Sequence, residues 1–191
     1  VSSSSLAAVM QSAPDELVIS PDGTHVFMID ANDYPRALVQ FSMSPAWDAS
    51  SLSFVASTSE EGLAAIAFSA DGTKFYWSEF GNHRIYEQTL GTPWDVTTRS
   101  SLTRNVPGYL TLPKESHVLS PAGDRFFSLG FNGELNESHL DVPYEMSSLD
   151  RTFNTLPNLA GSAFESINFS PDGKYILVTN RNTDTIVQYQ V

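Results

Sequence analysis

A tight turn recurs four times along the chain at nearly constant spacing. Its copies are SPDG at 20–23, SADG at 69–72, SPAG at 120–123 and SPDG at 170–173. The serines that open these turns lie 49, 51 and 50 residues apart. A fixed period of this length is typical of a repeat architecture, so each local motif has to be interpreted as one part of a repeat of about 50 residues.

Each copy of the turn joins an apolar segment to a segment in which aromatic or β-branched residues alternate with other residues. An apolar run precedes the turn and an aromatic or β-branched run follows it, which predicts a β-hairpin. An Asp in such a turn is a candidate metal ligand, but a structural role is favoured because Ala122 replaces it in the third copy while the glycine stays. Glycine adopts positive φ at little cost, so we expect a structural role for the four turn glycines, Gly23, Gly72, Gly123 and Gly173.

A second marker lies between the turns and joins a proline, an aromatic residue and an acidic residue. It occurs as SPAWDASSL at 44–52, TPWDVTTRSSL at 92–102 and VPYEMSSL at 142–149. Proline and Asp favour turns, so each repeat is divided into four short strands. Trp47 and Trp94 in this marker have two interpretations: they pack at a seam between repeats, or they present a platform for a sugar ring. Packing is favoured because the position recurs.

Four antiparallel strands in every repeat of this length predict an all-β fold, a β-propeller of four blades. We expect one domain over 1–191, with blades around 11–57, 58–105, 106–156 and 157–191, the last completed by 1–10. The chain ends on a third strand and begins on a Ser-rich segment like the fourth strands. The N-terminal strand is therefore expected to complete the C-terminal blade and to close the ring. A segment of a longer array would show the same pattern.

The hairpins also resemble known repeats. The SPDG hairpins are similar to PD40 and YVTN-type propeller repeats, and "IYEQTLGTPWDVTT" with "FSADGTKFYW" resembles the TPWD repeats of bacteriophage virion and tail proteins and of extracellular proteins of marine bacteria. The third repeat departs from this pattern, with PAG for PDG and PYE for PWD. The resemblance covers almost the whole chain and implies a structural or adhesive module, located on a virion or a cell surface.

The charge balance restricts the partners. There are 22 Asp and Glu against 10 Lys and Arg, a net charge of −12. Such a surface repels nucleic acid and anionic lipid, so we expect no nucleic acid partner. No apolar run reaches the roughly 20 residues that span a bilayer, so no membrane insertion is expected. The chain has no cysteine, which excludes disulfides and Cys-ligated zinc. Cations, neutral glycans and protein neighbours stay open as partners.

One set of acidic residues recurs at a fixed place before the turns. Five residues before the turn serines lie Asp15, Ala64, Glu115 and Glu165. The innermost strands of a propeller line its channel, so the three carboxylates are candidates to hold Ca²⁺ there, with Glu16 and Glu61 near enough to contribute. The alternative is that these carboxylates lie in solvated loops and hold no ion. The four histidines lack zinc-site spacing, and no nucleophile elbow or phosphate loop is present.

Four loops at 31–36, 80–84, 130–134 and 180–184 vary in content and are expected to share one rim of the ring. Variable loops on a rigid scaffold are common recognition sites. We therefore expect a non-catalytic binding module that holds a protein neighbour or a glycan through rim residues Tyr34, Phe80, Asn82 and Arg181. The alternative is a lactonase-like or hydrolase-like propeller enzyme with a channel cation. Symmetric assembly into a homo-oligomer is a third expectation.

Overall fold

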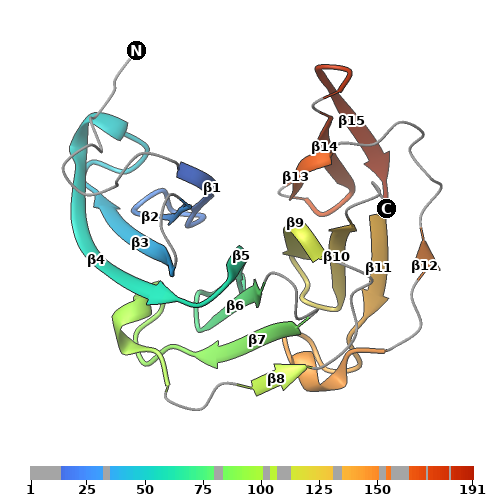
Figure 1. Cartoon of the computed structure of the whole chain (residues 1–191), viewed down its shortest axis with the longest axis horizontal. Helices are drawn as coiled ribbons and strands as arrows, with labels where there is room; N and C mark the ends of the chain where they lie inside the picture. The colour runs from blue at the N-terminus through green and yellow to red at the C-terminus, as the bar shows by residue number, and fades with distance from the viewer. Residues whose placement is uncertain are drawn as a thin grey trace.

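A computed structural model describes the backbone of residues 14–31, 35–79, 84–100, 104–106, 113–130, 135–150, 154–155, 164–170, 172–180 and 182–191. Within these ranges the regular structure is β-strands with three short 3₁₀ helices, so the prediction of an all-β class is confirmed. The strands form four antiparallel sheets, and Figure 1 shows them following one another along an arc. No helix in the described part of the chain is long and apolar enough to cross a membrane.

Three of the sheets have four strands in chain order, as the repeat predicts. The first contains β1 (Pro14–Ile19), β2 (His25–Asp30), β3 (Arg36–Met43) and β4 (Leu52–Glu60). The second contains β5 (Leu63–Phe68), β6 (Lys74–Glu79), β7 (Arg84–Thr89) and β8 (Arg104–Val106). The third contains β9 (Pro113–Leu119), β10 (Arg125–Gly130), β11 (Leu135–His139) and β12 (Asn154–Thr155).

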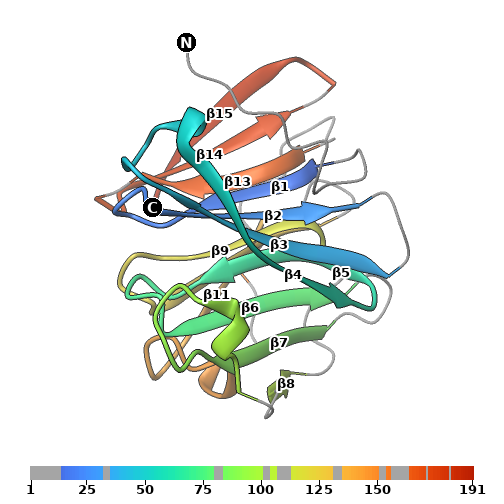
Figure 2. The same cartoon turned by 90° about the vertical axis from the view of Figure 1, so that its left-hand side faces the viewer.

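The fourth sheet contains three described strands, β13 (Phe164–Phe169), β14 (Tyr175–Asn180) and β15 (Thr185–Gln190). Residues 1–10, which were expected to complete it, lie outside the described residues. No sheet among the described strands closes on itself, so the predicted ring of four blades stays a prediction. In the side view of Figure 2 the long outer strand β4 runs diagonally relative to β1, as expected for a strongly twisted sheet.

The SPDG turn is held by its own side chains. Ser20 Oγ donates to Asp22 Oδ1 at 2.6 Å, and the Thr24 N–H donates to the same oxygen at 3.1 Å. Ser20 Oγ in turn accepts the N–H of His25 at 2.9 Å. Gly23 has φ of +72°, the left-handed conformation that only glycine adopts without strain. These bonds connect both strands of the hairpin.

The third copy of the turn keeps this arrangement although it lacks the Asp. Ser120 Oγ donates to Asp124 Oδ1 at 2.7 Å, so the acceptor comes from the far side of the glycine. The Arg125 N–H still donates to Ser120 Oγ at 3.1 Å. The carboxylate therefore has a structural partner in this copy too, which explains how the turn tolerates Ala122.

The second marker folds back onto the first turn of the same sheet. Trp47, Trp94 and Tyr144 all have φ near +61°, and each donates its N–H to the carbonyl of the turn glycine at 2.9–3.0 Å. Asp48 and Asp95 then cap the 3₁₀ helices η1 (Ala49–Ser51) and η2 (Val96–Thr98) through Oδ1. In η3 (Met146–Ser148) no side chain caps the helix, because Glu145 pairs with Lys74 of the second sheet instead.

Apolar clusters fill the three junctions between consecutive sheets. Phe27 and Leu38 of the first sheet pack with Ile66 and Phe75 of the second. The other two junctions are built the same way and use Tyr76 with Phe126, and Phe127 with Ile176. The two inner strands of the second and third sheets therefore bury one face against the preceding sheet and the other against the following sheet, and this explains apolar runs such as Leu63–Phe68.

Polar side chains cross the same junctions. Gln40 Nε2 donates to the Trp94 carbonyl at 2.9 Å, and Gln40 Oε1 accepts the Val96 N–H at 3.1 Å. Glu87 occupies the corresponding place in the second sheet, where it accepts the Met146 N–H at 2.7 Å and pairs with Lys74 at 3.1 Å. A side chain of the third strand thus binds the outer turn of the following sheet.

Candidate active site

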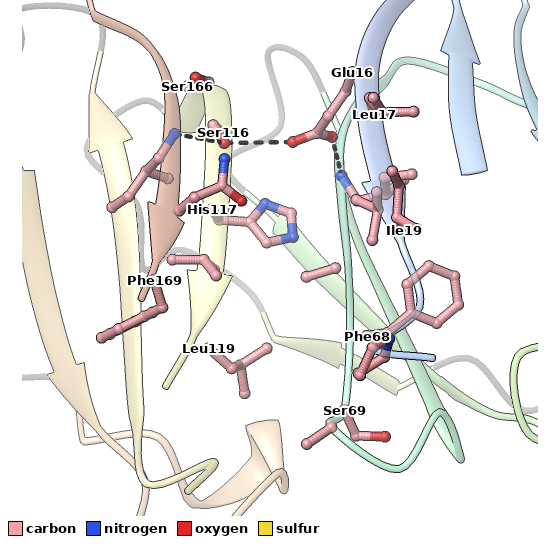
Figure 3. A pocket seen from close by; sticks show the side chains of 18 of the residues that line it. Glu16, Leu17, Ile19, Phe68, Ser69, Ser116, His117, Leu119, Ser166 and Phe169 are labelled. Carbon is pink, nitrogen blue, oxygen red and sulfur yellow. Dashed lines mark hydrogen bonds between the residues drawn. The ribbon is translucent and has the colours of Figure 1, made fainter. Parts of the chain in front are cut away.

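The four innermost strands enclose one cavity. β1, β5, β9 and β13 all contribute to its wall, and its volume is about 1310 Å³. Figure 3 shows residues from these strands pointing into the space. Most of the lining is aliphatic or aromatic, with a small number of carboxyl, hydroxyl and imidazole groups. A concave apolar site with few polar groups is the common form of a small-molecule site.

Glu16 is the polar group at the centre of this wall. Its Oε2 accepts the main-chain N–H of Ile66 at 2.6 Å, and its Oε1 accepts from Ser116 Oγ at 3.3 Å. Ser116 Oγ also accepts the N–H of Ile167 at 3.3 Å. The dashed lines in Figure 3 trace this chain of bonds. One carboxyl and one hydroxyl thereby connect the inner strands of all four sheets.

The inner strands are edge strands of their sheets, so alternate main-chain N–H groups on them are available for these bonds, and each inner hairpin also contains an irregularity. The pairing register shifts between Pro14 and Leu17, between Leu63 and Ala65, and between Phe164 and Ile167, and the third hairpin shifts at the same place. A bulge takes main-chain groups out of the ladder with the neighbouring strand. Ile66 and Ile167 follow the shifts and stay in register with Trp77 and Val178, and their N–H groups donate to a side chain of another sheet.

The surroundings of Glu16 favour its neutral form. Its carboxyl keeps some surface on the cavity but is mostly enclosed by protein, and this burial raises its pKa to about 8. The bonds from Ile66 and Ser116 oppose the rise, and the nearby charge of Asp15 adds to it. The site therefore holds a carboxyl group that gains and loses its proton close to neutral pH, which is the property of a general acid or base.

His117 lies next to Ser116 in β9 and is fully buried. Burial lowers the pKa of its imidazole to about 3, so the ring is neutral. Its ring centroid lies 5.5 Å from that of Phe126, and neither ring nitrogen has a hydrogen-bond partner among the described residues. Leu17, Ile66 and Ile167 occupy the same repeat position. The imidazole thus takes the place of an aliphatic side chain in the wall.

The residues expected to hold a cation are only partly brought together. Asp15 pairs with Arg36 at 3.0 Å, and Arg36 also donates to the Leu63 carbonyl at 3.2 Å. Glu165 lines the cavity. The side chain of Glu115 lies outside the described residues. The described side chains contain no group of three His, Asp or Glu arranged for a metal ion, and Asp15 pairs with Arg36. Since the side chain of Glu115 is not among them, the Ca²⁺ site stays a prediction.

The other predicted site residues divide into two groups. The rim residues Tyr34, Phe80, Asn82 and Arg181 all lie outside the described residues. The Trp94 ring packs in the first junction, with its centroid 5.2 Å from that of Phe68, whereas Trp47 is exposed. The four glycines lie in the turns with φ between +70° and +74°.

Sequence reasoning missed the central role of Glu16 and Ser116. They lie four residues before the turn serines, one position after the acidic set that was singled out, and the corresponding residues are Ala65 and Ser166. The sequence feature that could have identified them is that this position carries a polar residue in three of the four repeats. Neighbouring residues of a strand face opposite sides, so a shift of one position selects a different set of side chains.

No protein-family model matches the chain, and no curated protein matches it. Solved structures match in fold. A candidate 6-phosphogluconolactonase of Bacteroides fragilis matches with a TM-score of 0.59 and 17% identity, over 93% of this chain and 50% of that one. A second, from Bacteroides uniformis, matches with 0.61 and 18%, over 99% and 54%. The Cps50 (Swd1) β-propeller domain of Myceliophteria thermophila matches with 0.50 and 12%, over 93% and 55%.

These similarities establish a propeller-type repeat fold. The chain spans about half to three fifths of the length of the structures it matches. The resemblance to propeller repeats is confirmed at this level, while the comparisons do not support the narrower TPWD repeat family of phages. The prediction of a virion or adhesive module is wrong, because the matched structures include two candidate lactonases.

Proposed function

We propose that this chain forms part of a lactonase-like propeller that hydrolyses a cyclic ester in its central cavity. The observation that carries the proposal is the Glu16 carboxyl, which lies in a cavity of about 1310 Å³ with a pKa of about 8. The similarity in fold to two candidate lactonases supports the same reaction class. No step requires a metal ion held by Asp15, Glu115 and Glu165.

Glu16 supplies the proton transfers that lactone hydrolysis needs. In its ionised form it accepts a proton from a water molecule whose oxygen attacks the carbonyl carbon of the lactone. When the tetrahedral intermediate collapses, the ring C–O bond breaks and the same carboxyl returns the proton to the departing oxygen. The product is a hydroxy acid. The bonds from Ile66 and Ser116 hold the carboxyl in place during both transfers.

Charge favours an uncharged substrate over a phosphorylated one. The cavity lining contains the Asp15–Arg36 pair, which has no net charge, Glu16, whose neutral form is favoured below about pH 8, and Glu165. The chain as a whole carries a net charge of −12. Like charges repel a phosphate group as it approaches such a cavity. We therefore expect a neutral sugar lactone to react faster than its phosphate ester.

The test measures release of acid from glucono-δ-lactone and from its 6-phosphate, after subtraction of spontaneous hydrolysis. The chain should hydrolyse the neutral lactone, and Glu16→Gln should lower the rate at least about 100-fold, as expected for loss of a general base. Glu61→Gln is the matched control, because Glu61 is an exposed glutamate outside the cavity lining. No hydrolysis by the native chain, or equal rates in both variants, would contradict the proposal.

A further inference from the structure

Some side chains of the fourth sheet are exposed although the residues at the same repeat position in the other sheets are buried. Seven residues after each turn serine, Phe27, Tyr76 and Phe127 are fully buried against the following sheet. The corresponding residue of the fourth sheet, Leu177, is 38% exposed. The same position therefore changes from core to surface where the series of sheets ends.

The third strands show the same difference more strongly. Leu38, Ile85 and Leu135 occupy one repeat position and are at most 2% exposed. Their counterpart Ile186 is 70% exposed. We call Leu177 and Ile186, which lie on the side of the fourth sheet away from the third, the last face.

The opposite end of the series has a matching surface. Ile66, His117 and Ile167 share a repeat position and are at most 3% exposed, whereas their counterpart Leu17 is 53% exposed. Trp47 is 64% exposed, while Trp94 in the next sheet is partly buried. We call Leu17 and Trp47, on the side of the first sheet away from the second, the first face.

The internal junctions show how these two faces fit together. Leu38 and Ile66, the counterparts of Ile186 and Leu17, belong to one apolar cluster at the first junction. Leu135 and Ile167 do so at the third junction. Residues at the repeat positions of the last face thus already pack against residues at the repeat positions of the first face inside the chain, so the two faces are complementary. In a single chain both stay exposed, and Figure 1 shows the first and fourth sheets at opposite ends of the arc.

We propose that the last face of one chain packs on the first face of a second copy, and the reverse, so that two copies form a single ring. The two contacts are equivalent and close under a two-fold axis. Leu17 and Trp47 also line the cavity, so the two proposals share a surface, but the mass of the assembly is measured without substrate and tests this proposal alone.

Polar groups at both faces match the internal junctions as well. Gln188 is the counterpart of Gln40, which donates to the carbonyl of Trp94. In the assembled ring Gln188 donates to the carbonyl of Trp47 in the second copy. Ser166 is the counterpart of Glu16 and Ser116, which accept main-chain N–H groups from the following inner strand. The second copy thereby extends the wall of the cavity.

The test is the mass of the full chain in solution, measured by sedimentation and light scattering over a range of concentrations. We expect twice the mass of one chain, and Ile186→Arg should weaken dimerisation at least 100-fold. Val142→Arg is the matched control, because Val142 is an exposed aliphatic residue (52%) outside both faces. A monomer at every concentration, or equal effects of the two variants, would overturn the proposal.

Cross-linking identifies which chain occupies the last face. The chain has no cysteine, so Leu17→Cys and Ile186→Cys each introduce a single thiol. When the two variants are mixed and oxidised, we expect a disulfide-linked dimer that contains one of each. A double variant that forms the disulfide only within one chain, at monomer mass, would show instead that the four sheets close on themselves and would refute the second copy as the partner.

Discussion

The indole of Trp94 lies directly over Gly72 of the same sheet. A Cβ built on Gly72 would be 2.2 Å from Trp94 Nε1, and the Trp94 N–H donates to the Gly72 carbonyl at 2.9 Å. Trp47 and Gly23 repeat this contact, and Tyr144 covers Gly123 in the third sheet. The glycine of one turn and the aromatic residue of the other, about 20 residues apart, therefore form one structural unit.

Gly72→Ala should destabilise the protein strongly. The new methyl group would overlap the Trp94 ring, and alanine at a φ of +70° costs about 1–2 kcal/mol in backbone strain alone. We expect the free energy of unfolding to fall by more than about 2 kcal/mol. Gly91→Ala is the control: its nearest contact would be 3.3 Å, to the Thr98 carbonyl oxygen. Equal urea midpoints for the two variants would contradict the described unit.

The pKa of Glu16 predicts how stability changes with pH. The folded state raises this pKa from 4.5 to about 8, so the folded chain binds more protons than the unfolded chain between these values. Stability from this group is therefore complete below pH 4.5 and is lost as pH rises towards 8. Urea denaturation of Glu16→Gln, compared with the native chain from pH 5 to 8, should show a smaller decline. Parallel curves would argue against a buried carboxyl.

Lys74 stabilises the second junction by pairing with Glu87 and Glu145. Glu87 is 4% exposed, so Lys74→Met would leave a carboxylate in the junction without its cation. We expect a loss of about 2 kcal/mol or more in the free energy of unfolding. Glu87→Gln on the same background should recover most of it, because Gln40 occupies the same position at the first junction without a cation. A double-mutant cycle with no coupling would contradict this role.

The hairpins and the all-β class could be predicted because their determinants are local. The Ser, the Gly and the following strand that specify each hairpin lie within about ten residues of one another. The same pattern occurs in four copies, so each copy supports the interpretation of the others. Gln40 and Val96 lie 56 residues apart, and their hydrogen bond depends on how one sheet packs on the next. Contacts of this kind leave no pattern in a single sequence.

The side chains that link the inner strands lie one residue after the acidic set singled out in the sequence, for a physical reason. Asp15 and Glu16 are adjacent, and simple alternation does not decide between them in a strand with a bulge. The structure pairs Asp15 with Arg36 and directs Glu16 towards Ile66 and Ser116. Which carboxyl bonds to the neighbouring inner strands thus depends on local backbone irregularity, which residue type alone does not reveal.

The bonds of Glu16 couple the chemistry of the cavity to the positions of the sheets. Ile66, Ser116 and Ile167 belong to three different sheets, and all are connected through this carboxyl and one hydroxyl. Loss of the Glu16 proton places a negative charge where the inner strands meet and strengthens the bonds that it accepts. The protonation state of one side chain therefore sets the strength of the hydrogen bonds that link the first sheet to the second and the third.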